Sequence, residues 1–259
     1  MKLLNLFLFT FSLLLITSCD EGNQLLSPRE EINEEVIGVT NVDLDANRNV
    51  VRTGEALIGN MVSDGMFEFL ANNGYSLDFS LVNGGNIRYN SATNPDGIYD
   101  SGELTRQDAS DIFPFNNTIY LVTVTGEQLK EIFERGVAFA PEPFGGFLQV
   151  SSHIQVFVDL TQQPQELDET TEPPTIVTEG QRVIQILING NAVLSNENYT
   201  FSFNSFGADG GDGFVTMQAL PAAQKVDTEL FEDDVLAGYI QSVSVVAPVI
   251  ESRIVISNE

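Results

Sequence analysis

The chain has 259 residues, 42% of them hydrophobic, so it is long enough to bury a substantial core in one large domain or two small ones. Its formal net charge is −26 at pH 7, and its 11 Lys and Arg residues are scattered singly. A polyanion needs clustered basic residues, so nucleic acid is excluded as an expected partner. No internal repeat is evident, and we predict a single domain.

The N-terminus has the pattern of a bacterial lipoprotein. Lys2 precedes an apolar run over residues 3–16, which is short for a membrane span and typical of a signal peptide. Small residues then precede Cys19, the single cysteine of the chain. We predict a lipoprotein signal peptide over residues 1–18 and lipidation of Cys19. The alternatives are an ordinary cleaved signal with a spare cysteine, or a free or intermolecularly paired thiol.

A polar, acidic segment follows, with Pro28 and no apolar period. Residues 19–35 are therefore predicted to form a disordered tether, and the ordered domain is predicted over residues 36–259. This arrangement predicts a lipid-anchored protein of the bacterial cell envelope, either periplasmic or exposed on the surface.

The first predicted elements are a helix, two strands and a second helix. From Glu55 to about Leu70, apolar residues recur at helical spacing and predict a helix. Alternation predicts a strand over residues 77–81, and residues 118–124 are predicted to form another. A capping-box pattern over residues 125–128 then opens a helix that is predicted to end at residue 136.

The second half of the chain predicts mostly strands. They are expected over residues 147–150 and 154–158, in a hairpin over 183–188 and 192–194 around Asn189-Gly190, over 199–204 and over 253–257, with a helix from Thr228 to about Ser242. Residues 162–181 contain three prolines and no period, and we predict a surface insertion there. The mixture predicts an α+β fold, with a mixed β-sheet flanked by helices.

Three turns carry glycine pairs, aromatic residues or both: Leu81–Arg88, Ile112–Asn117 and Ser205–Phe214. Glycine pairs such as Gly84-Gly85 and Gly210-Gly211 allow positive φ and let a ligand approach the backbone. Most such pairs are simply turns, so the surrounding side chains must decide.

Those side chains suit a nucleotide. Phe115 and Phe206 lie in polar or glycine-rich turns and offer two faces for a flat base. Asn83 carries a carboxamide, Arg88 can make two parallel hydrogen bonds to a phosphate, and Asp212 can accept bonds from sugar hydroxyls. A core position is the alternative for each phenylalanine.

Seven ordered motifs carry a family resemblance. They are Gly59–Asp64, Leu81–Arg88, Phe113–Asn117, Val124–Leu129, Phe147–Ser151, Tyr199–Phe201 and Ala208–Phe214. From about Val36 onward, the chain resembles the C-terminal domain of the periplasmic and ecto-5′-nucleotidases, a family that also includes UDP-sugar and cyclic-nucleotide hydrolases. It departs from the family pattern at Asn86, where a glycine is common, in an enlarged turn over residues 94–102 and in the long insertion over residues 162–181.

The resemblance implies a role for each matching residue. These roles are base stacking for Phe115 and Phe206, a hydrogen bond to the base for Asn83, ribose contact for Asp212, phosphate contact for Arg88 and Arg52, and a backbone contribution from Gly146. A structural ion pair is the alternative for Arg52.

The histidine count decides what this chain is expected to lack. The resemblance implies that hydrolysis belongs to a separate N-terminal metallophosphatase domain, whose two metal ions are held by histidines, aspartates and an asparagine. Here His153 is the single histidine, and it lies between two predicted strands, where a structural role is favoured. We therefore expect no catalytic residue and no cofactor on this chain, with divalent metal ions expected on the partner domain.

Two functions follow from these expectations. The first is the nucleotide-binding half of a split 5′-nucleotidase-type hydrolase that works with a separate metallophosphatase chain. The second is a lipoprotein that binds nucleotides or nucleosides without hydrolysing them. A third interpretation, an interaction module with an unused pocket, is disfavoured because the binding residue types are retained.

Overall fold

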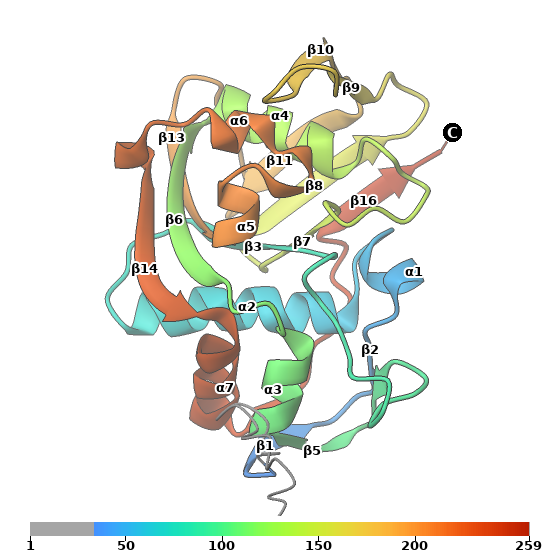
Figure 1. The fold of residues 1–259 in the computed structure, drawn as a ribbon, viewed down its shortest axis with the longest axis vertical. Helices are drawn as coiled ribbons and strands as arrows, with labels where there is room; N and C mark the ends of the chain where they lie inside the picture. Colours follow the sequence, from blue (N-terminus) through green and yellow to red (C-terminus); the bar gives the residue numbers. More distant parts are fainter. Residues whose placement is uncertain (1–33, 259) are drawn as a thin grey trace, which may run out of the picture. The chain divides into compact units, whose positions relative to one another are not determined.

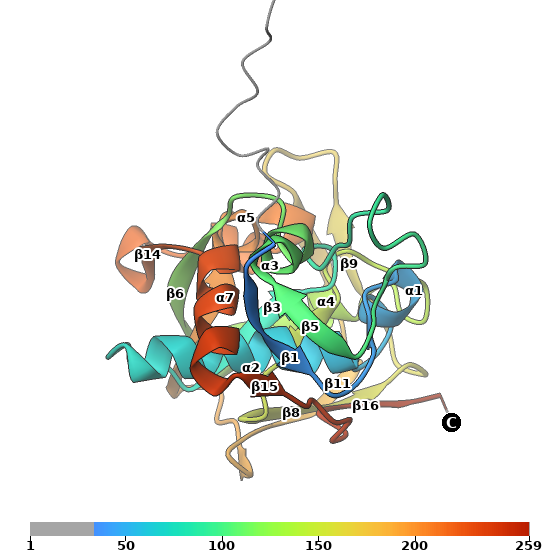
Figure 2. The ribbon, with the colours of Figure 1, turned by 90° about the horizontal axis from the view of Figure 1, so that it is seen from below.

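The computed structural model of the chain describes residues 34–258, shown from two directions in Figures 1 and 2. Cys19, the predicted signal peptide and all but the last two residues of the predicted tether lie outside the described residues. The first described strand, β1 (Val36–Thr40), begins at the residue where the predicted domain starts.

A five-stranded mixed sheet carries the residues that form the candidate site. Its strands, in spatial order, are β14 (Lys225–Phe231), β6 (Thr118–Thr125), β13 (Asn198–Asn204), β3 (Phe79–Asn83) and β7 (Leu148–Val150). β13 is parallel to β3 and antiparallel to β6, so Phe201 lies beside Phe79 on one side and Val122 on the other. Every residue of β3 is buried, because apolar layers cover both faces of the sheet.

Two helices form the layer on one face of this sheet (Figure 1). Helix α2 (Leu57–Asn72) packs against β3 and β7, and helix α7 (Glu232–Val243) packs against α2. The buried side chains of α2 include Ile58, Met61 and Leu70, which confirms the helix predicted from their spacing.

A second sheet and helix α4 form the layer on the other face. The sheet has the order β12 (Asn191–Ala192), β11 (Val183–Ile188), β8 (Ile154–Asp159) and β16 (Ile254–Ser257). Helix α4 (Gly126–Gly136) contacts strands of both sheets and begins with the predicted capping box. Asn189 and Gly190 have φ of 50° and 78°, as the predicted hairpin turn requires.

A third sheet lies beside α7 and α3, as Figure 2 shows, and has the order β15 (Val245–Val246), β1 and β5 (Gly102–Thr105). The shorter elements complete the fold. They are β2 (Leu44–Asp45), α1 (Arg48–Val51), β4 (Ile98–Tyr99), α3 (Arg106–Ile112), β9 (Gln165–Asp168), β10 (Thr175–Glu179), α5 (Ser205–Ala208), η1 (Gly211–Gly213), α6 (Val215–Gln218) and η2 (Ala222–Gln224). β9 and β10 pair as an antiparallel hairpin within the predicted insertion. The predicted α+β fold with a mixed sheet and flanking helices is confirmed.

The predicted start of the last helix is wrong. Residues 228–231 belong to β14, which pairs with β6, and α7 begins only at Glu232. Thr228 Oγ1 donates to the Ile119 carbonyl at 2.8 Å, which holds this segment against β6. Three acids occupy the first turn of α7, where the helix dipole favours negative charge, and they mark the true start. No helix within residues 34–258 is long and apolar enough to span a bilayer.

An ion pair anchors the C-terminal strand to α2 and β7. The buried guanidinium of Arg253 donates to both oxygens of Asp64, at 2.9 and 2.7 Å, and to the Val150 carbonyl at 3.0 Å. We predict that Asp64→Asn lowers the free energy of unfolding by about 3 kcal/mol, because the buried charge loses its main partner. Urea denaturation measures this change. Glu68→Gln, at an exposed position of the same helix, is the control and should cost less than about 0.5 kcal/mol. Equal costs for the two variants would contradict the assigned role of Asp64.

Candidate aromatic and guanidinium pocket

The three predicted turns meet around one pocket of about 440 Å³. A volume of this size suits a nucleoside. The lining residues come from the segments after α1, β3, α3 and β13 and before β7, and they are Arg52, Asn83, Gly85, Asn86, Arg88, Phe115, Asn117, Gly145, Phe206 and Asp212. Six of the seven predicted binding residues are among them. The seventh, Gly146, lies directly after Gly145.

The turn at Gly84 and Gly85 shapes the wall of the pocket through close backbone contact. Gly84 N donates to the Phe147 carbonyl and Gly85 N to the Gly145 carbonyl, each at 2.7 Å. A Cβ at Gly84 would lie 2.1 Å from the Val51 carbonyl oxygen. Glycine is therefore required at these two positions because there is no space for a side chain. Positive φ, the predicted reason for glycine, applies to Gly210 in the third turn, where φ is 100°.

Asn83 and Asp212 form a hydrogen-bonded pair inside the pocket. Asn83 Nδ2 donates to Asp212 Oδ2 at 2.8 Å, and Asn83 Oδ1 accepts from Asn204 Nδ2 at 2.8 Å. Burial raises the pKa of Asp212, while the bond from Asn83 and the nearby arginines oppose that rise. Asp212 has φ of 56°, and its carbonyl accepts from Arg135 Nε at 2.8 Å, so both its backbone and its side chain are held in place.

Phe115 and Phe206 face the pocket from two turns, and each is 49% exposed. The Arg88 guanidinium lies 5.0 Å from the centre of the Phe115 ring and stabilises it by a cation–π contact. Phe206 is carried by α5, whose first turn is capped by Asn204 Oδ1, which accepts from Gly207 N at 2.8 Å. A Cβ at Gly211 would lie 2.4 Å from the Phe206 ring, so the backbone of the third glycine turn packs directly against that ring.

A guanidinium cluster forms the other end of the site. Arg52 and Arg88 line the aromatic pocket and also an adjoining cavity of about 350 Å³, where Arg48 joins them. Burial lowers the pKa of Arg52, and the positive charges of Arg88 and Arg48 lower it further. Within residues 34–258, none of the three forms an ion pair, and Arg52 Nε is buried without a hydrogen-bond partner. Positive charges gathered without ion pairs suit an anionic ligand.

Four lining or adjoining residues are not among the predicted binding residues. Arg48 lies four positions before Arg52 on the turn of α1, a spacing that places both on one side of a helix. Gly145 is next to the predicted Gly146. Asn86 was predicted only as a departure from the family pattern. Asn117 ends the second aromatic turn, and its polar side chain close to Phe115 in the sequence could have indicated a place in the pocket.

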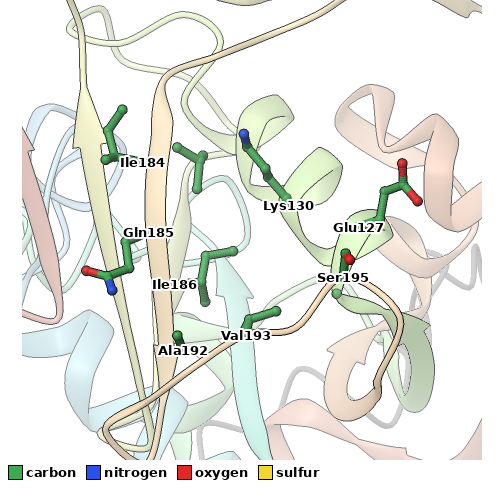
Figure 3. Close-up of a pocket in the computed structure, with 10 residues that line it drawn as sticks. Glu127, Lys130, Ile184, Gln185, Ile186, Ala192, Val193 and Ser195 are labelled. Atoms are coloured by element: carbon green, nitrogen blue, oxygen red, sulfur yellow. The ribbon is translucent and has the colours of Figure 1, made fainter.

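The other concavities lack this convergence of groups. A groove of about 450 Å³ lies between α4 and the β11–β12 hairpin, and Figure 3 shows Ile184, Ile186 and Val193 along it with Glu127 and Lys130 on the helix. It has no aromatic lining, so its similar volume does not make it a comparable site. His153 lies elsewhere, stacked on Phe67 at 3.6 Å between ring centres, and burial lowers its pKa. No group of three or more possible metal ligands occurs in the described part of the chain.

Comparison with known proteins identifies the family of this domain. The family model described as "5′-nucleotidase, C-terminal domain" matches residues 36–219. The chain belongs to this family. Its relatives include the trifunctional nucleotide phosphoesterase protein YfkN of Bacillus subtilis, which is 31% identical over 82% of this chain and 13% of its own length. The 5′-nucleotidase of Homo sapiens is 27% identical over 84% of this chain and 36% of its own.

Solved structures agree with the family. A 5′-nucleotidase precursor from Thermus thermophilus matches with a TM-score of 0.72 and 28% identity, covering 87% of this chain and 40% of that one. The NAD nucleotidase of Haemophilus influenzae has the same fold, with a TM-score of 0.69, 18% identity and coverage of 88% and 39%. The 5′-nucleotidase C-terminal domain described here thus spans less than half the length of these relatives.

A buried acid behind the pocket of this domain predicts a pH dependence. Burial raises the pKa of Glu232 to about 7 from its ordinary value near 4.5, against hydrogen bonds from neighbouring asparagines that oppose the rise, and Asp233 adds to it. The folded state therefore holds this proton more tightly than the unfolded state, so the contribution of Glu232 to stability is full below pH 4.5 and is lost as the pH rises through 7. Urea denaturation should show the wild type losing on the order of 3 kcal/mol relative to Glu232→Gln between about pH 4.5 and 8. Parallel curves for the two proteins would refute this.

Proposed function

We propose that this chain is the nucleotide-binding half of a split 5′-nucleotidase-type hydrolase. The base stacks on Phe115 and Phe206, and Asp212 accepts hydrogen bonds from the ribose hydroxyls. Arg52 and Arg88 bind the phosphate, with Arg48 in the adjoining cavity contributing positive charge.

One observation carries this proposal. The pocket combines two half-exposed aromatic rings, a held carboxylate and guanidiniums without ion pairs, in a chain whose charge is −26. An aromatic pair alone would suit many flat ligands, and an arginine cluster alone would suit any anion. A ligand that satisfies both ends is flat at one end and anionic at the other, with hydroxyls between them. A nucleotide has this structure, and the family membership supports the same ligand class.

Hydrolysis in this proposal depends on a second polypeptide. The described residues include no cluster of metal ligands, while the relatives are named as a nucleotide phosphoesterase and a 5′-nucleotidase and extend well beyond the matched region. We propose that a metallophosphatase chain supplies the divalent metal ions and the attacking water to the phosphate that Arg52 and Arg88 hold. The envelope location and the lipid anchor at Cys19 are part of this proposal and rest on the N-terminal sequence pattern.

Nucleotide binding is tested by removing the aromatic faces. Phe115→Ala and Phe206→Ala should each weaken binding of a nucleoside monophosphate by about 5- to 100-fold, because each removes one stacking face worth about 1–3 kcal/mol. Isothermal titration calorimetry on the purified protein measures the effect.

Phe139→Ala is the matched control. Phe139 is also 49% exposed, yet it packs against Phe144 and Arg135 and does not line the pocket. Its loss should leave the affinity unchanged within about twofold. Equal losses in all three variants, or no heat with any nucleotide, would refute nucleotide binding in this pocket.

The split arrangement is tested by reconstitution. Mixing the protein with a single-domain metallophosphatase encoded by the same genome should raise phosphate release from nucleoside monophosphates at least about tenfold over either protein alone, since positioning a bound substrate accelerates its reaction. Phe115→Ala should reduce that gain, and Phe139→Ala should not. A partner that is fully active alone, with no gain on mixing, would contradict the split enzyme and favour binding without hydrolysis.

A further inference from the structure

Glu232 lies behind the pocket and contacts three segments that build it. It is the first residue of α7 and is almost completely buried. Its Oε2 accepts from Asn86 Nδ2 at 2.7 Å, and the side chains of Asn117 and Asn204 lie near enough to lower the pKa of the carboxyl. Its backbone N donates to the Asn117 carbonyl at 3.2 Å. A buried carboxylate needs such donors, and here all of them are amides from the pocket region.

The carboxylate determines which way these amides point. An ionised carboxylate only accepts hydrogen bonds, so each asparagine must turn its amino group toward Glu232. Asn86 then has its oxygen free to accept from Asn117 Nδ2, and this bond is present at 3.1 Å. The amino group of Asn117 is thereby engaged by Asn86, whose own orientation Glu232 fixes. Its Oδ1 is the polar atom of that amide left for a ligand, and Asn117 lines the pocket.

The second branch runs from Glu232 through Asn204 to the sugar end. Asn204 Nδ2 donates to Asn83 Oδ1, and its own oxygen caps α5, the helix that carries Phe206. With its oxygen occupied, Asn83 offers its amino group to Asp212. One carboxylate therefore sets the amide orientations on both sides of the space beside the aromatic rings.

We propose that Glu232 is a positioning residue for base selection: it holds Asn117 with its oxygen toward the pocket and so favours bases that carry an amino group on the facing ring edge. This inference rests on the proposed nucleotide binding. An amino group donates to Asn117 Oδ1, whereas a ring carbonyl at the same place sets two acceptors against each other and leaves both unpaired.

The test compares adenosine with purine riboside, which differs from adenosine only in lacking the amino group. Calorimetry is carried out at about pH 8, because burial raises the pKa of Glu232 to about 7 and its carboxyl is ionised there. The wild type should bind adenosine about tenfold to a hundredfold more tightly than purine riboside. Glu232→Gln replaces one acceptor oxygen with an amino group that faces the amide donors, so the orientations of Asn86 and Asn117 are no longer fixed and the ratio should fall to within about threefold.

Asp233→Asn is the matched control. Asp233 is the next residue of α7, and its carboxylate pairs with Arg106 at 2.9 Å and does not line the pocket. This variant should lose stability in thermal melting but keep the ratio of the two nucleoside affinities. Should Glu232→Gln not fold, Asn117→Ala provides the second test and should also bring the ratio to within about threefold, because it removes the acceptor itself.

The affinity ratio separates positioning from a purely structural role. Equal weakening of both nucleosides in Glu232→Gln, with the wild-type ratio kept, would overturn the inference. Equal binding of the two nucleosides by the wild type would overturn it as well and would leave nucleotide binding itself standing. Failure of the wild type to bind any nucleoside or nucleotide would overturn both.

Discussion

The pocket depends on backbone segments that approach too closely for any side chain to lie between them. The turn after β3 lies against Val51 on one side and against residues 145–147 on the other, joined by the two 2.7 Å hydrogen bonds of Gly84 and Gly85. This contact places the end of α1, the end of β3 and the start of β7 within one ligand's reach. A Cβ at Gly84 would separate α1 from β3, and Arg52 would move away from Asp212 with it.

The two ends of the site differ in whether their polar groups have partners within the protein. Beside the aromatic rings, amides and carboxylates satisfy one another in two hydrogen-bonded sets, Glu232 with Asn86 and Asn117, and Asp212 with Asn83 and Asn204. At the other end, Arg48, Arg52 and Arg88 have no carboxylate partner among the described residues, in a chain with an excess of acids. The first arrangement gives a rigid wall of fixed hydrogen-bonding direction, and the second leaves positive charge for a ligand.

Local sequence signals predicted the elements whose stability is mainly local. The apolar spacing of α2 and the capping box of α4 specify helices with little help from the rest of the fold, and both predictions are confirmed. Residues 228–231 were wrongly predicted as helix. Their local preference for a strand is weak, and they form one because they pair with β6, which lies about a hundred residues earlier. Glu232 was consequently predicted to lie inside a helix, whereas it is the first residue of α7 and lies behind the pocket.

The fold class, the family and the residue types of the site were predictable from the amino-acid sequence, because short motifs around glycine turns constrain the local backbone wherever they occur. Six of the seven predicted binding residues line one pocket for that reason. The use of their polar groups is visible only in the folded chain. Asn83 is bound to Asp212 and Asn204, Arg52 Nε has no hydrogen-bond partner among the described residues, and Glu232 holds Asn86, which in turn holds Asn117. Hydrogen-bond direction depends on which groups meet across distant segments, and no local pattern encodes that.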